Sequence, residues 1–445
     1  MSLSSKTATV ESSTAHESEQ NAIWKKISWR IIPIVLIAYV MAFLDRINVG
    51  YAKLTMQSDL SFSDEVYGLG AGIFFLSYLL FEVPSNLWME RLGARLTFVR
   101  IMVLWGLTSA ATALVTTPAQ FYIVRLLLGM FEAGLFPGVI LYLTYWYPSA
   151  RRGRVTGLFL FGIPIAGIIG SPLSGWILKH FDGIGGWHGW QWMFVLEGLP
   201  TVLLGFLVYA VLADRPESAR WLTDKEKAIV HDVMTADQAG HNPAAAHGAG
   251  LKAALLDSRT WIMAFVYFTC ACAVYTLTFW LPTMVKGLGV SDISLVGWYT
   301  AIPFGFGGLG VLLLSYSSDY FRERRWHVAS TLIVGSLVLY STQFVGGGLV
   351  VTLTLLSIAS FFIFACALFW SIPPTYLSPK TSAAGIAIIS SIGILGGFVS
   401  PTLIGWLKTL TGSMESGLLV MTLIICLGGL TVLFTIPRAA LRVGR

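Results

Sequence analysis

Long apolar runs alternate with short polar segments along almost the whole chain. Cut at charged residues, glycine and proline, these runs are each near the ~20 residues that cross a bilayer as a helix. Their approximate limits are 27–51, 64–88, 96–116, 119–146, 154–178, 190–213, 258–285, 293–318, 326–345, 348–376, 382–407 and 415–437. The pattern therefore predicts an all-α membrane protein with twelve transmembrane helices.

Polar segments divide the chain into tails, halves and a central loop. We expect an N-terminal tail at 1–26, a first six-helix half at 27–213, a central loop at 214–257, a second half at 258–437 and a C-terminal tail at 438–445. Thr223 and Glu226 have the spacing of a capping box, which predicts a short surface helix in the loop. The Ala/Gly/His-rich sequence near 238–250 is typical of a flexible linker. The polar tail has no hydrophobic segment with a cleavage site, so we expect no signal peptide.

Composition narrows the class of protein. Of 445 residues, 55% are hydrophobic and 12% are charged, about half the ~25% charged share of soluble domains. This excludes a soluble enzyme, a secreted disulfide scaffold and a disordered regulator. The cysteines lie in apolar runs without metal or redox spacing and are interpreted as buried thiols: Cys270, Cys272, Cys366 and Cys426.

The net charge of +6 is unevenly distributed. Of the 29 Lys and Arg residues, 23 fall in the tails and in the loops on one side of the predicted spans. The opposite side holds only four, namely Lys53, Lys179, Lys286 and Lys408. Because cytoplasmic loops carry the excess of Lys and Arg, both termini are predicted to be cytoplasmic, in a cell inner membrane. The positive charge thus reflects topology and does not indicate nucleic-acid binding.

The two halves repeat each other at an offset of about 229 residues. A charged loop, 90–95, follows the second span, and Asp319 with Arg322 follows the eighth. Ser171-Pro172-Leu173-Ser174-Gly175-Trp176 in the fifth span resembles 400–406 in the eleventh. Two six-span halves in a parallel repeat predict the major facilitator fold. The charged loop after span 2 resembles the signature of that superfamily, in which an acid and a base tie neighbouring helix ends together on the cytoplasmic side. Here Asn86 stands in place of glycine and Ala94 in place of a base. The resemblance implies a gating role for Glu90, Arg91, Arg95 and Asp319.

Charged residues inside the predicted spans are the main functional candidates, since an ionised side chain at the bilayer centre costs ~2.5–3.5 kcal/mol even on insertion scales. All those identified lie in the first half: Asp45, Arg46, Glu82, Arg125 and Glu132. Arg125 and Glu132 are two turns apart, ~10.5 Å along a helix, so each needs another partner. Glu82 precedes Val83-Pro84 and is interpreted as a helix-end or gating residue.

Two interpretations of these charges remain open. In one, Asp45–Arg125 and Arg46–Glu132 form a structural network that holds the half together. In the other, a free guanidinium binds a substrate carboxylate, and a partly buried carboxylate takes up and releases a proton. Anion and proton would then load the same cavity.

The motifs around these charges resemble the anion:cation symporter family of the major facilitator superfamily. They are 44–50 (Leu-Asp-Arg-Ile-Asn-Val-Gly), 81–86 (Phe-Glu-Val-Pro-Ser-Asn), 125–138 with Arg125, Glu132 and Pro137, and 220–223 (Arg-Trp-Leu-Thr). Members include bacterial permeases for tartrate, galactonate, phthalate and hydroxyphenylacetate. The resemblance implies proton-coupled uptake of an organic anion.

Site roles follow from this resemblance by position. Arg125 corresponds to the substrate-carboxylate ligand, Asp45 and Glu132 to the protonatable pair, and Arg46 to the salt-bridge partner of the unloaded state. Residues expected to line the cavity are Tyr78, Tyr275, Phe279 and Trp280.

The eleventh span departs from the family pattern at two positions. Ser390 and Ile394 stand where relatives usually carry asparagine. An asparagine amide offers donors and an acceptor to a hydroxylated substrate, and isoleucine offers neither. We therefore expect a less hydroxylated anion than a sugar acid, such as an aromatic or simple dicarboxylic acid. A polyhydroxy sugar acid remains the alternative, since Ile394 can simply pack against a neighbour.

The sequence favours symport over several other functions. No nucleophile–base set or Cys/His spacing supports an enzyme, and the repeat with its buried acid–base set favours alternating access over a channel. Exchange or facilitated diffusion without proton coupling remains an alternative mechanism. The predicted partners are the organic anion, protons and the lipid bilayer, with no cofactor, metal or nucleic acid, and we expect a monomer.

Overall fold

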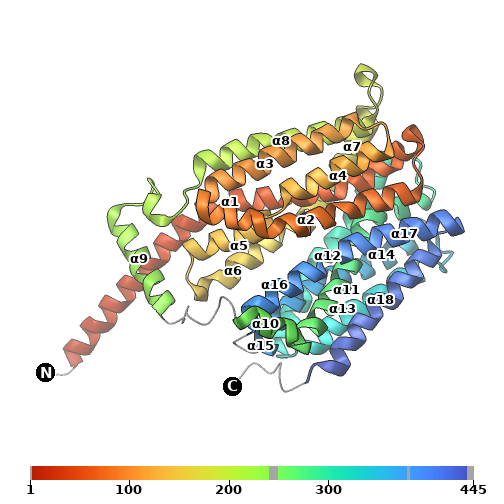
Figure 1. The fold of residues 1–445 in the computed structure, drawn as a ribbon. Coiled ribbons are helices and arrows are strands. Elements are labelled where there is room, and N and C mark those ends of the chain that lie inside the picture. The colour runs from red at the N-terminus through yellow and green to blue at the C-terminus, as the bar shows by residue number, and fades with distance from the viewer. Residues whose placement is uncertain (1–2, 240–248, 378–380, 438–445) are drawn as a thin grey trace.

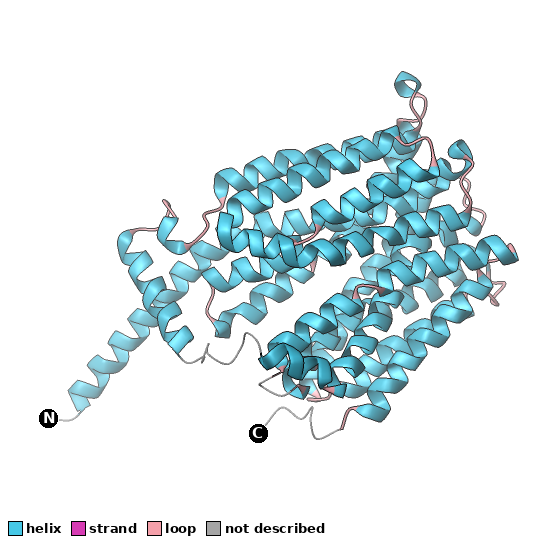
Figure 2. Cartoon of the chain, in the orientation of Figure 1, coloured by secondary structure: helices cyan, strands magenta, loops and turns pink. Residues whose placement is uncertain are grey.

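The computed structural model describes residues 3–239, 249–377 and 381–437, and these are helical with connecting loops (Figure 2). The first bundle consists of α1 (Leu3–Leu60), α2 (Asp64–Leu92), α3 (Ala94–Ala111), α4 (Pro118–Glu132), α5 (Leu135–Trp146), α6 (Ser149–Leu160), α7 (Gly162–His180) and α8 (Gly189–Val211). The second consists of α11 (Ser258–Gly287), α12 (Ile293–Tyr320), α13 (Arg325–Ser341), α14 (Gly348–Phe364), α15 (Pro373–Tyr376), α16 (Ser382–Gly393), α17 (Gly396–Thr411) and α18 (Glu415–Thr435). Figure 1 shows the two bundles side by side.

The predicted spans correspond to these helices. By length and composition, eleven segments of the described chain can cross a membrane. The predicted span at 326–345 is not among them, because α13 has only 17 residues; it packs against α14 and α18 within the second bundle. The polar tail is helical, since α1 is one helix from Leu3 through the first span, and its start projects from the bundle (Figure 1).

The central loop contains the predicted surface helix. This is α9 (Asp224–Ala239), and its capping box is formed as expected: Thr223 N donates to Glu226 Oε2 at 2.8 Å, and Glu226 N donates to Thr223 Oγ1 at 3.3 Å. Lys26 on α1 also donates to Glu226, which holds the pKa of that exposed carboxyl below its usual value. A short α10 (Ala249–Leu256) leads into the second bundle. Most of the predicted linker and the C-terminal tail lie outside the described residues.

Several predicted spans are broken helices. The fourth divides into α4 and α5 at Gly134, whose φ of 93° favours glycine. The fifth divides into α6 and α7 at Phe161, and the eleventh into α16 and α17 near Ile394. The tenth passes through a 3₁₀ segment at Ala365–Ser371 before the prolines that begin α15. Breaks of this kind are tolerated at membrane depth where they face other protein segments.

The two bundles contact each other through glycines at matching positions of the repeat. Gly68 on α2 lies against Pro401 and Gly405 of α17, and a Cβ there would clash with the Pro401 carbonyl oxygen. Gly297 on α12 lies in the same way against Ser171 of α7. Gly68 and Gly297 are 229 residues apart, as the sequence repeat predicts. The repeat therefore builds two pseudo-equivalent crossings between the bundles.

These crossings close one face of the molecule. Along α1 the contact residue Gly50 lies beyond residues 39–46, and along α2 the contact residues Gly68 and Gly72 come before Tyr78. The closed face is therefore the one remote from α9, α10 and the start of α1 (Figure 1). The space between the bundles at 39–46 and 78–82 lies on the side of the termini.

Candidate functional site

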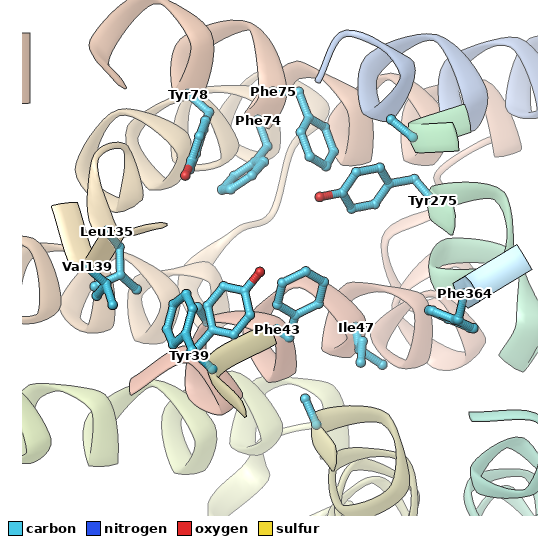
Figure 3. Close-up of a cluster of buried hydrophobic side chains, with 14 of the residues drawn as sticks. Tyr39, Phe43, Ile47, Phe74, Phe75, Tyr78, Leu135, Val139, Tyr275 and Phe364 are labelled. Atoms are coloured by element: carbon cyan, nitrogen blue, oxygen red, sulfur yellow. The ribbon is translucent and has the colours of Figure 1, made fainter. Parts of the chain in front are cut away.

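A cavity of about 140 Å³ lies between the bundles. Its walls are mainly apolar, include eight aromatic side chains and come from both halves; four of these aromatic residues, Tyr39, Phe43, Tyr78 and Tyr275, are labelled in Figure 3. Its ionisable lining groups besides tyrosines and cysteines are Arg46 and Glu82. Ser390 and Ile394 also line it, so five of the predicted site positions meet here with Arg46: Tyr78, Glu82, Tyr275, Ser390 and Ile394.

Arg46 joins the two halves at this cavity. Its Nε and Nη2 donate to Glu132 Oε1 at 2.9 and 2.6 Å, and its Nη1 donates to the Tyr275 hydroxyl at 2.9 Å. The guanidinium also lies 5.0–5.3 Å from the ring centroids of Phe43, Phe74 and Tyr78. Glu132 is 1% exposed, and its Oε2 has no hydrogen-bond partner among the described residues. The expected Arg46–Glu132 pair is thus present, with one carboxylate oxygen still free.

The position of Glu132 depends on the break between α4 and α5. Gly134 approaches Ser85 so closely that a Cβ would clash with the serine side chain. The helix therefore ends at Glu132, and Phe136 at the start of α5 reaches the cavity wall. The Glu-Ala-Gly sequence was the available signal for this break, which the sequence analysis did not identify.

Arg125, the predicted carboxylate ligand, lies outside the cavity and against the main chain of α2. Its side chain is 1% exposed, donates from Nε to the Gly70 carbonyl at 3.1 Å, and faces the Phe74 ring at 5.2 Å. It does not line the cavity. The alternative Asp45–Arg125 ion pair is not formed in the described structure, because Arg125 points to the main chain of α2 rather than to α1.

A second buried polar cluster contains Asp45 and an acid that the sequence analysis overlooked. Asp45 accepts hydrogen bonds from Ser109 at 2.7 Å and Asn48 at 3.0 Å. Glu197 on α8 accepts one from Ser174 at 2.7 Å. Both carboxyl groups are 1% exposed, and each has one oxygen without a partner in the described chain. Glu197 falls inside the predicted span 190–213, so the five charges taken from the sequence were an incomplete set.

Two residues expected in the cavity belong to the closed face instead. The Phe279 ring lies on Phe75 and Tyr275, and its carbonyl accepts from the Tyr67 hydroxyl at 2.9 Å. Trp280 lies 4.9 Å from the Lys53 ammonium, measured to the ring centroid. Neither lines the cavity, because they lie one and more turns beyond Tyr275 along α11, at the glycine contact.

The closed face is held by the four lysines that the charge pattern placed on that side. Asp64 accepts from Lys53 at 2.8 Å and from Lys408 of the second half at 3.1 Å. Lys179 pairs with Asp292 at 2.6 Å, and Lys286 donates to the Leu54 carbonyl at 2.8 Å. We call these contacts the lysine gate. Three of the four lysines bridge the halves directly, and Lys53 does so through Asp64.

The Lys179–Asp292 ion pair is expected to persist at neutral pH. The hydrogen bond from Lys179 holds the pKa of the exposed Asp292 carboxyl below its ordinary value. Since a depressed carboxyl pKa gives stabilisation that is lost only as the pH falls through that value, the pair stays formed throughout the neutral range.

We expect Asp64→Asn to open this gate, because Lys53 is 3% exposed and would lose its counter-charge. Unpairing a buried charge costs ~3–5 kcal/mol, so the open fraction at this face should rise about tenfold or more. Spin labels at the exposed positions Ser58 and Thr411, on opposite halves, would report the distance between the halves at this face by double electron–electron resonance. The matched control is Asp319→Asn, whose partner Arg324 lies in the same half at 2.7 Å; an unchanged distance distribution in Asp64→Asn would contradict the prediction.

At the side of the termini, the predicted gating motif is only partly engaged. Arg95 donates from its side chain to the Tyr209 carbonyl at 2.6 Å, and its main-chain N donates to Asp214 at 2.9 Å. Glu90 and Arg91 are exposed at the end of α2. Asp319 pairs within its own loop. In this conformation these residues therefore do not link the two halves.

Comparison with known proteins identifies the fold. A family model described as Major Facilitator Superfamily matches residues 35–401. The chain belongs to the major facilitator superfamily. The predicted fold class is thereby confirmed, and the protein is a multi-pass membrane transporter rather than an enzyme.

Individual relatives of this major facilitator protein support the same conclusion. It is 44% identical over 415 residues to a Pseudomonas putida protein provisionally named metabolite transport protein NicT, covering 92% of this chain and 93% of the relative. It is also 44% identical over 399 residues to an Agrobacterium vitis protein whose name provisionally assigns it to tartrate transport, covering 89% and 87%. These relatives fit the anion:cation symporter-type family that the motifs resemble.

A solved structure shares the fold. The xylose transporter XylE from Escherichia coli, in a partially occluded inward-open conformation, has a TM-score of 0.69 at 15% identity, with 92% of this chain and 98% of that one covered. The cavity between the bundles, with Arg46 at its wall, is the candidate functional site of this major facilitator transporter.

Proposed function

We propose that this protein is a proton-coupled symporter that imports a small organic anion across a bacterial inner membrane, with both termini in the cytoplasm. With that orientation, the cavity on the side of the termini and the closed lysine gate describe the inward-facing state of an alternating-access cycle. The charge asymmetry of the loops supports the orientation, and the relative named for tartrate transport supports an anionic solute.

The observation that carries the proposal is the Arg46–Glu132 pair at the cavity wall. Both donors of Arg46 on that side, Nε and Nη2, are held by one oxygen of Glu132. A proton arriving on Glu132 would neutralise the carboxylate and release these two donors. The guanidinium then offers the bidentate geometry that binds a carboxylate. One proton balances the charge of one substrate carboxylate at this site, so each lowers the cost of binding the other.

Roles of the other candidates follow from their places. Tyr275 keeps one hydrogen bond to Arg46 from the second half and can transmit occupancy between the halves. Arg125, held by the main chain of α2, supports the wall behind Phe74 in this state, and its predicted role as carboxylate ligand is left to another conformation. Asp45, with Glu197, is a second place where a proton can be held, since a bare buried carboxylate is costly.

The cavity favours an aromatic or simple dicarboxylic acid over a sugar acid. Its walls include eight aromatic rings, and Ser390 and Ile394 provide a single hydroxyl where asparagines would provide two amides. Apolar rings of a substrate can stack on such walls. Hydroxyl groups of a sugar acid would lose their hydrogen bonds to water without replacement.

We expect the double change Ser390→Asn and Ile394→Asn to shift preference toward polyhydroxy acids by about tenfold, because each new amide can satisfy a substrate hydroxyl worth ~0.5–1.5 kcal/mol. Competition of galactonate against an aromatic acid in uptake assays would measure the shift. A variant at Ser391, the neighbour of Ser390 that does not line the cavity, is the control. An unchanged profile would mean that α16 does not select the substrate.

Purified protein in proteoliposomes with an internal pH dye would test the proposal. Tartrate, galactonate, phthalate, hydroxybenzoates, hydroxyphenylacetate and short dicarboxylates would be added outside one at a time. Acidification with one class identifies the substrate and supports proton symport. Raised thermal stability with the same acids, but no acidification with any of them, would replace symport by anion exchange.

A further inference from the structure

A groove of about 390 Å³ opens on the outer surface of the first bundle, away from the transport cavity. It lies between α2, α3 and α4 near the end that carries the termini. Its wall is almost wholly apolar and includes Phe81, Pro84 and Trp88 of α2, Leu104 of α3 and Phe131 of α4. Trp88 is 53% exposed and Phe81 41%, so this surface faces the lipid.

One charge stands in this apolar setting. Arg100 lines the groove six residues after α3 begins, ~9 Å along the helix. Its Nη2 donates to Ser85 Oγ at 2.8 Å, and its guanidinium lies 4.7 Å from the Trp88 ring centroid. Its Nη1 is buried and has no hydrogen-bond partner among the described residues.

No carboxylate balances this guanidinium. Within the parts of the chain that the structure describes, no Asp or Glu oxygen forms an ion pair with Arg100, whereas Arg46 in the same bundle has Glu132. A charged side chain against a lipid-facing apolar surface without a partner is costly. Arg100 donates to one neutral hydroxyl only, so its Nη1 remains available as a hydrogen-bond donor to a ligand.

We propose that this groove binds an anionic phospholipid, with the lipid phosphate on Arg100 and an acyl chain along the apolar wall. Guanidinium groups bind phosphate oxygens through two parallel hydrogen bonds, and basic pockets between transmembrane helices on the cytoplasmic side bind anionic headgroups. The groove lies on the side that carries 23 of the 29 basic residues. The site is independent of which solute the protein transports.

Native mass spectrometry of the full-length protein in detergent, supplied with phosphatidylglycerol or phosphatidylethanolamine, tests this. We expect preferential retention of phosphatidylglycerol. Arg100→Gln should lower that adduct about fivefold or more by removing the charge. Leu104→Trp should lower it similarly by filling the groove while Arg100 stays, so the test does not depend on one variant folding. Arg91→Gln, an exposed arginine at the same end of the bundle, should retain the lipid.

Three results would overturn the proposal. Equal retention of the two lipids would remove the charge preference. Wild-type adducts in both Arg100→Gln and Leu104→Trp would place the lipid elsewhere. Displacement of phosphatidylglycerol by millimolar glycerol phosphate would mean that the acyl chain contributes nothing and that the groove is not a lipid site.

Discussion

Glu132→Gln should abolish proton-driven accumulation while exchange of the anion across the membrane persists. The glutamine amide cannot take up a proton, and Arg46 loses the carboxylate that now holds two of its donors. The guanidinium is then free for the substrate at every pH. We expect the substrate-driven pH signal to fall about a hundredfold or more, in line with loss of a positioned proton acceptor, while counterflow of labelled anion stays measurable.

The matched control is Glu415→Gln, an exposed acid at the start of α18 outside the cavity. It should retain both accumulation and exchange. Accumulation that survives intact in Glu132→Gln would remove Glu132 from the coupling mechanism and move attention to Asp45 and Glu197. Loss of both activities would mean instead that the Arg46–Glu132 pair is needed for the fold, which thermal unfolding of the variant would show.

Gly68→Val should prevent the halves from closing on the face remote from the termini. A Cβ at Gly68 would clash with the main chain of α17, which cannot move aside as a flexible side chain can. Overpacking of this kind costs ~1–3 kcal/mol, which predicts a shift of about tenfold to a hundredfold toward the state open at that face. Transport should fall accordingly, because the cycle must pass through the closed contact.

The repeat supplies an internal check on this second result. Gly297→Val, at the equivalent crossing, should behave like Gly68→Val. Gly153→Val should not, since a Cβ at Gly153 meets no atom within 4 Å. Spin labels at Ser58 and Thr411 measure the opening in all three proteins. A closed distance distribution in Gly68→Val would show that the crossing relaxes around an added side chain.

Much of the architecture follows from the length of the apolar segments and from the 229-residue repeat, because both are properties of the sequence that do not depend on packing. Gly68 and Gly297, which form the two crossings, lie at the same offset of 229 residues. The Arg46–Glu132 pair was one of two pairings left open, since helix periodicity gives the face of a residue but not its neighbour. For the same reason Arg125 could not be directed to the α2 main chain from sequence.

Two further features of the site are marked in the sequence, and a third is not. Glu197 stood inside a predicted span and could have been found by charge alone. The break after Glu132 was marked by Gly134. The pairing of Lys408 with Asp64, by contrast, depends on how two separate bundles are placed against each other, and no local pattern encodes that distance.

The lysine gate makes ionic strength a conformational variable. Its parts differ in exposure: the Lys179 and Asp292 side chains are 47% and 32% exposed, while Lys53 is 3% exposed. Salt screens exposed charges strongly, with a Debye length of ~8 Å at physiological concentration, and buried pairs much less. Added salt should therefore weaken the Lys179–Asp292 side of the gate before the Lys53 side, so that the two crossings release in sequence and the salinity at that face sets how readily the transporter opens there.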